Sequence, residues 1–203
     1  MSNASPSVDP ANTGSLLGLF NTAMLKLKQD MDGAIPGIVQ AFDRGTNRVQ
    51  VLPAIKMIGT NNEQVPRAPI ANVPVFVLGA GGFGISFNLR AGDTGLLIAC
   101  DRDISIFTQS GGESSPQSTR MKSFSDSYFL PDVMKNFTVL GEDLDNLVIQ
   151  KNDGSVRISL SDDTVKIVAP NIELSGLTEI TGNLAVIGNI TATGNITPNV
   201  PPV

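Results

Sequence analysis

Apolar positions near the start of the chain recur at helical spacing. Residues 1–14 are small and polar, and we expect them to form a disordered arm ahead of a helix in the segment 1–33. From Ser15 to Gly33, apolar side chains repeat at intervals of three and four, which predicts an amphipathic helix with Ser15 as its N-cap and Gly33 at its end. The apolar stripe could dock on the chain's own domain or on another protein. The candidate docking residues are Leu16, Leu19, Phe20, Ala23 and Leu27.

Over residues 34–110 the apolar period changes to two. The runs are "GIVQAFD", "RVQVLPAI", "VPVFVLG", "FGISFNLR", "TGLLIACD" and "DISIFT". Val49 and Val51 alternate with polar neighbours, as do Ile85, Phe87 and Leu89, so one face of each strand should be buried. Six short strands in so short a segment predict a small, closed β-barrel of the OB type.

The rest of the chain divides into a polar link and a repetitive shaft. Residues 111–140 begin "GGESSPQSTR", and we expect a linker and an exit segment from the barrel. From residue 141 to 203, short alternating runs return and then give way to a repeat. The candidate core positions of this shaft are Val156, Ile158, Leu160, Val165, Ile167, Leu184, Val186, Ile190 and Ile196.

The repeat has a six-residue period that is marked by glycine and asparagine. Its members are Gly176, Gly182, Asn183, Gly188, Asn189, Gly194 and Asn195. Both residue types tolerate the positive φ of tight corners, which indicates a β-solenoid or β-helix. The left-handed hexapeptide β-helix of acyltransferases does not fit, because its coils use about three hexads each and its chemistry uses a histidine base. This chain has four glycines at that period and no histidine.

An intertwined trimer is the other structure that uses such a repeat. One chain of this length has too few side chains to enclose a core, whereas three identical chains can fill the inside of a prism with Ile, Val and Leu. We therefore predict a mainly β protein, in which a short N-terminal helix and an OB-like barrel precede a trimeric β-helix or prism.

Composition excludes several functions. The net charge of −5 argues against nucleic acid as a partner, because phosphate binding needs clustered Lys and Arg. No signal peptide or apolar membrane span is present in this sequence, so we expect synthesis in the cytoplasm. The single cysteine, Cys100, is expected to be a buried small apolar residue.

No catalytic, cofactor-binding or metal site is predicted. Gly79, Gly81 and Gly84 satisfy the dinucleotide-binding spacing, but a dinucleotide site needs a helix at this point and the sequence continues at period two. We expect a hairpin loop there instead. The acidic residues of the shaft are most simply solvated turn residues. They are Glu142, Asp143, Asp145, Asp162 and Asp163.

The order of these segments resembles the central spike proteins of contractile-tail phage baseplates. The resemblance lies in "PGIVQAFDRGTNRVQVLPAI", "FGISFNLRAGDTGLLIACDRDIS" and "MKSFSDSYFLPDV", and it covers most of residues 36–200. It implies a homotrimer in the virion, at the tail baseplate. Its barrels would attach to a trimeric hub protein, and its shaft would pierce the host outer membrane when the sheath contracts.

The chain also departs from this family. Such spikes often end in an apex whose His-x-His pairs hold iron, and this sequence has no histidine. We therefore expect no cofactor and a separate small tip protein. A spike lysozyme would need two carboxylates in a cleft domain, for which no insertion is long enough. A trimeric tail fibre or adhesin that binds a receptor remains the alternative, although it would normally carry a larger terminal head.

Overall fold

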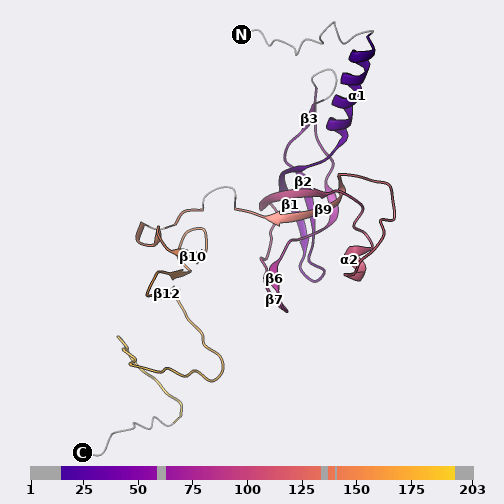
Figure 1. Ribbon diagram of the computed structural model, residues 1–203. Coiled ribbons are helices and arrows are strands. Elements are labelled where there is room, and N and C mark those ends of the chain that lie inside the picture. Colours follow the sequence, from indigo (N-terminus) through magenta and orange to yellow (C-terminus); the bar gives the residue numbers. More distant parts are fainter. Residues whose placement is uncertain (1–14, 59–62, 134–136, 140, 195–203) are drawn as a thin grey trace, which may run out of the picture. The chain divides into compact units, whose positions relative to one another are not determined.

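The computed structural model describes residues 15–58, 63–133, 137–139 and 141–194. It divides into two compact units, Met1–Phe137 and Thr138–Val203, each described by itself (Figure 1). The predicted N-terminal helix is present as α1, Leu16–Asp30. The Gly18 N–H donates to Ser15 Oγ at 3.0 Å, so Ser15 is the N-cap as predicted. Lys26 pairs with Asp30 at 3.0 Å in the last turn.

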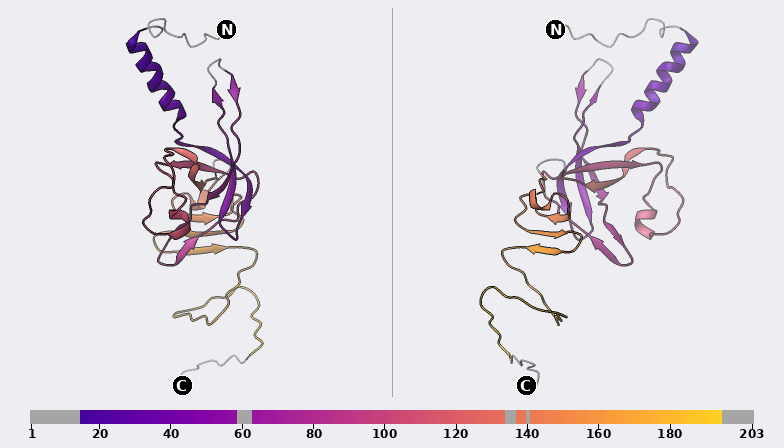
Figure 2. Two further views of the ribbon diagram at one scale, coloured as in Figure 1. Left: turned by 90° about the vertical axis from the view of Figure 1, so that its right-hand side faces the viewer. Right: turned by 60° about the vertical axis from the view of Figure 1, so that its left-hand side comes forward.

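Five strands of the first unit form one antiparallel sheet. They are β1 (Ala34–Asp43), β2 (Arg48–Pro53), β5 (Ile70–Pro74), β8 (Thr94–Cys100) and β9 (Ser123–Pro131), in the order β5-β2-β1-β8-β9. The two edges approach each other just after β5, where Val75 forms a parallel bridge with Phe129 and the Phe76 N–H donates to the Phe129 carbonyl at 2.8 Å. The sheet is therefore a nearly closed barrel (Figure 2), as in the partly open five-stranded OB fold.

The barrel has a small core made mostly of valine. Val49 and Val51 are buried as their alternation predicted, and they pack with Val39, Leu97 and Phe129. The side chains at these five positions are at most 1% exposed. The first unit thus has a hydrophobic core of its own.

Two hairpins belong to the long connections between barrel strands. One pairs β3 (Met57–Ile58) with β4 (Gln64–Val65), and the other pairs β6 (Leu78–Ala80) with β7 (Phe83–Ile85). The alternation that predicted a half-buried strand from Ile85 to Leu89 was therefore only partly correct. Leu89 is buried, whereas Ile85 and Phe87 are at least half exposed.

The run "DISIFT" is not a strand. It contains a tight turn and the start of the short helix α2 (Phe107–Ser110). The buried carboxylate of Asp103 accepts hydrogen bonds from the Ser105 N–H at 2.9 Å and from Ser118 Oγ at 2.7 Å. These hydrogen bonds from Ser105 and Ser118 hold the pKa of Asp103 well below its usual range. The turn therefore replaces the extended backbone that the apolar alternation suggested.

The barrel continues beyond residue 110. Its last strand, β9, lies inside the segment 111–140, where we expected a linker and an exit segment. It pairs with β8 from Pro131 opposite Gly95 to Ser123 opposite Cys100. Residues 111–122 form the connection that leads into this strand.

The described part of the second unit contains one small antiparallel sheet. A 3-10 turn at Gly141–Asp143 precedes β10 (Leu147–Gln150), β11 (Arg157–Leu160) and β12 (Val165–Val168), which pair in that order. Residues 169–194 form no strand. The predicted prism requires three chains, and among the described residues of this single chain the last regular strand ends at Val168.

Candidate functional site

The sheet of the second unit has one entirely apolar face. The strand register places Leu147, Leu160 and Val165 in one row, and a parallel row of three isoleucines lies beside it. Each of the six side chains is 39% to 64% exposed. Four of them were predicted as shaft core, namely Ile158, Leu160, Val165 and Ile167; the sequence pattern missed Leu147 and Ile149.

The opposite face of the same sheet carries a buried polar network. The Asp143 carboxylate, 1% exposed, accepts hydrogen bonds from Arg157 Nε at 2.8 Å, Ser159 Oγ at 2.7 Å and Lys166 Nζ at 3.0 Å. Glu142 forms ion pairs with the same Arg157 and Lys166, so two acids balance two bases. The expectation that Asp143 is a solvated turn residue was therefore wrong, because the strands deliver three donors to it.

These contacts change the acidity of the carboxyl group. The hydrogen bond from Ser159, supported by those from Lys166 and Arg157, lowers the pKa of Asp143 to about 2, although burial opposes this shift. Asp143 is thus ionised at neutral pH and fixes the register of β11 and β12. The network therefore has a structural role on one face of the sheet. The apolar face on the other side is exposed and free to contact a partner.

The repeat segment presents further apolar side chains. Gly176, Gly182 and Gly188 adopt positive φ values of 121°, 135° and 146°, which glycine tolerates better than other residues. Leu177 and Ile187 are fully exposed, and the predicted core positions Val156, Leu184, Val186 and Ile190 are also exposed. Asn183, Asn189 and Gly194 belong to this described segment, whereas Asn195 and Ile196 lie outside the described residues.

Helix α1 presents a third apolar surface. Leu16, Leu19, Phe20 and Leu27 are each more than half exposed, and Ala23 is exposed as well. The described part of the first unit therefore does not bury the stripe that the sequence pattern marked as a docking surface.

The glycine-rich segment at residues 79–84 forms a hairpin, as predicted. Gly81 and Gly82 occupy its turn with φ of 61° and 86°, and no helix begins there, so the geometry for a pyrophosphate is missing. Leu78 pairs with Ile85, and Ala80 pairs with Phe83, which places these four side chains on one exposed face. The residue pattern in the sequence did not predict this exposed apolar tip.

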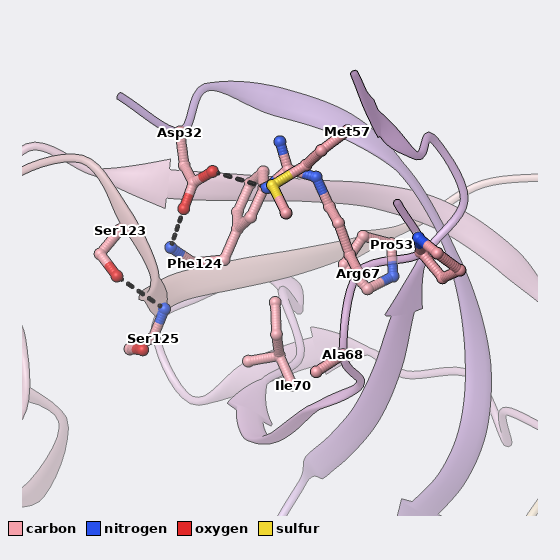
Figure 3. Close-up of a pocket in the computed structure, with 10 residues that line it drawn as sticks. Asp32, Pro53, Met57, Arg67, Ala68, Ile70, Ser123, Phe124 and Ser125 are labelled. Carbon is pink, nitrogen blue, oxygen red and sulfur yellow. Dashed lines mark hydrogen bonds and ion pairs between the residues drawn. The ribbon is translucent and has the colours of Figure 1, made fainter. Parts of the chain in front are cut away.

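A hollow with a volume of about 260 Å³ lies beside β9 in the first unit (Figure 3). Arg67 lines the hollow. Its guanidinium lies 5.3 Å from the centre of the Phe124 ring and 2.9 Å from the Asp32 carboxylate. Asp32 also accepts a hydrogen bond from the Phe124 N–H at 3.0 Å. These contacts link the α1–β1 connection, which contains Asp32, and the β4–β5 connection, which contains Arg67, to β9. Because Asp32 neutralises Arg67 and no nucleophile is paired with a base here, the hollow has no catalytic constellation.

The described residues were also compared with the requirements of a metal site, a membrane-spanning helix and a reactive thiol. They include no group of three or more His, Cys, Asp and Glu side chains that could hold a metal ion, and no helix among them has the length and apolar character needed to cross a membrane. Cys100 is a free thiol of intermediate burial, which raises its pKa.

The barrel is similar to a domain of a phage protein. Residues 35–132 match the family model described as the phage protein Gp138 N-terminal domain, and this range runs from β1 to the end of β9. No curated protein matches the chain. The match supports a structural, baseplate-related protein of a phage.

Proposed function

We propose that this chain is the central spike of a contractile-tail baseplate, and that it acts as a homotrimer that punctures the host outer membrane during sheath contraction. The apolar face of β10, β11 and β12 is the observation that carries the proposal. It is followed directly by a glycine-spaced repeat with exposed Leu, Val and Ile. A face of this kind on a soluble protein calls for a partner.

Identical copies of the chain are the partner that fits this face best. Full burial of one Val, Leu or Ile side chain contributes about 1.5–3 kcal/mol, so six roughly half-exposed ones offer about 5–9 kcal/mol per chain before the cost of association. A repeat also needs neighbours with the same period, which other copies of the chain supply. Three copies around an axis would enclose these side chains as the core of a prism.

The same architecture suits a mechanical function. In an intertwined prism, each strand forms hydrogen bonds with strands of other chains, so bending the shaft would break several ladders at once. The buried network around Asp143 stiffens the base of the shaft further. We infer that the barrels and α1 attach to a trimeric baseplate hub, while the repeat points toward the host envelope.

The tip of the proposed shaft differs from the iron-bearing apex of similar spikes. The sequence contains no histidine, so it cannot supply the imidazole ligands of an apex iron site. We propose that a separate small tip protein covers the end of the shaft and that the spike itself needs no cofactor. An end left uncovered would expose unpaired strand edges.

Immunogold electron microscopy of intact particles tests the proposal. Antibodies against the barrel, applied to particles with their baseplates opened, should label the tail axis at the distal end of the tube. Label on peripheral fibres would instead support the alternative, a trimeric fibre or adhesin that binds a receptor. Particles without label at either place would contradict a virion role.

A further inference from the structure

Helix α1 carries a second apolar pattern inside its stripe. Leu17, Phe20, Met24, Leu27 and the C-cap residue Met31 follow one another at spacings of three, four, three and four. This is the a and d spacing of a heptad repeat, in which Leu17, Met24 and Met31 occupy a while Phe20 and Leu27 occupy d. All five side chains are 38% to 71% exposed.

The flanking positions favour a bundle of several helices. Of the three g positions, Leu16 and Ala23 are apolar and Asp30 is acidic. As far as Ala23, the apolar seam is therefore wider than a strict a and d seam and matches the face of a helix within a bundle. Lys28 lies at an e position, where a parallel in-register partner would present Ala23, so no like charges meet there. The outermost f positions are polar, namely Thr22 and Gln29.

We propose that the α1 helices of the copies in one spike pack against each other as a short parallel coiled coil. The occupant of the seam is thus a second copy of this chain, and the proposal rests on the homotrimer of the proposed function. A helix of 15 residues is marginal by itself in water. Copies tethered through one assembly have a high effective concentration, which compensates for the short seam.

This arrangement changes which residues face the baseplate hub. Phe20 and Leu27, expected from the sequence to dock on the hub, become part of the seam between copies. Leu19 and Leu25 occupy c and b, on the outer side of the bundle, and both are more than half exposed. They leave the hub an apolar surface on the outside of the coiled coil.

Thiol cross-linking of the full-length protein tests the seam. Cys100→Ser first removes the native thiol, and Met24→Cys or Leu17→Cys then places one thiol per chain at an a position. Thr22→Cys, at an f position, is the matched control. A short bismaleimide tolerates thiol separations that a disulfide does not, so it reports proximity without ideal geometry. The mass of each variant is measured in parallel by light scattering.

The expected result is extensive cross-linking of two chains at Met24→Cys and Leu17→Cys on a denaturing gel, with Thr22→Cys left as single chains. No cross-linking at either a position, or equal cross-linking at Thr22→Cys, would overturn the coiled coil. If the mass of such protein is still that of a trimer, only this inference fails. A monomer mass for the parent protein would instead contradict the proposed homotrimer.

Discussion

At the residue scale, the centre of the barrel is shaped by one aromatic ring and two glycines. A Cβ at Gly95 would lie 2.5 Å from Phe129 Cζ and 2.4 Å from the Leu130 carbonyl oxygen. A Cβ at Gly37 would lie 2.4 Å from Val51 Cγ1. The Phe129 ring and the Leu130 carbonyl therefore occupy the space that a side chain at Gly95 would need, and the Val51 side chain occupies that space at Gly37.

Gly95→Ala should destabilise the barrel by about 1–3 kcal/mol, because the added methyl group overpacks a core in which backbone and ring cannot both move aside. Chemical denaturation followed by circular dichroism measures the effect. Gly33→Ala is the matched control, since a Cβ there meets nothing within 4 Å. Equal stability of the two variants would show that the core around Phe129 is loosely packed.

Asp143 makes the second unit sensitive to acid. Its pKa in the folded protein, about 2, lies below the ordinary aspartate value of 3.8, so its contribution to stability is present above pH 3.8 and is lost as the pH falls toward 2. Asp143→Asn should therefore lower the melting temperature at pH 7, and the difference from the parent protein should shrink between pH 4 and pH 2. Asp145→Asn, at an exposed acid, serves as the control. A difference that stays constant down to pH 2 would contradict the network.

At the scale of elements, β10, β11 and β12 form a sheet with its usual polarity reversed. In this chain the polar face is covered and the apolar face is open, although a half-buried sheet normally buries its apolar face. The reversal is explained if the open face is the interior of an assembly. The sheet then separates two roles, with register fixed by the Asp143 network and association driven by the opposite side.

Ile158→Lys should weaken self-association by at least about 100-fold, because each copy would bring an unpaired charge into an apolar interface. Ile158 lies in the middle strand of the face, opposite both Ile149 and Ile167. Ile58→Lys makes the same change at an exposed position of the first unit and should leave association intact. Analytical ultracentrifugation compares the two variants, and similar behaviour of both would exclude this face as the interface.

Sequence patterns predicted those elements whose signals are local. The α1 cap, the alternation in β2 and the hairpin at residues 79–84 all depend on neighbours within a few positions. Strand β9 was missed because its buried and exposed residues do not alternate regularly. Asp126 and Ser127 are adjacent and both buried, and the register of β9 against β8 shifts beside Cys100.

The buried acid could not be predicted for a related reason. Arg157 and Lys166 reach Asp143 only because β11 and β12 pair in one register, and nothing near Asp143 in the sequence indicates two bases that follow at residues 157 and 166. The missed apolar residues Leu147 and Ile149 likewise join the predicted face through pairing with β11. Non-local contacts thus decided both faces of the sheet.

At the scale of the whole molecule, the two units differ in what stabilises them. The first unit buries a valine-rich core within one chain. The second exposes its largest aliphatic side chains, from the face of β10 to the repeat. The stability of the second unit should therefore depend on association and hence on protein concentration.

The mass of the purified full-length protein in solution tests this account most directly. Light scattering coupled to size exclusion at micromolar concentration should give three times the chain mass of 21.3 kDa. The same value should persist on dilution as long as the apolar faces remain buried. A mass of 21.3 kDa at every concentration would contradict the central claim, because the open face and the repeat would then have no partner among copies of this chain.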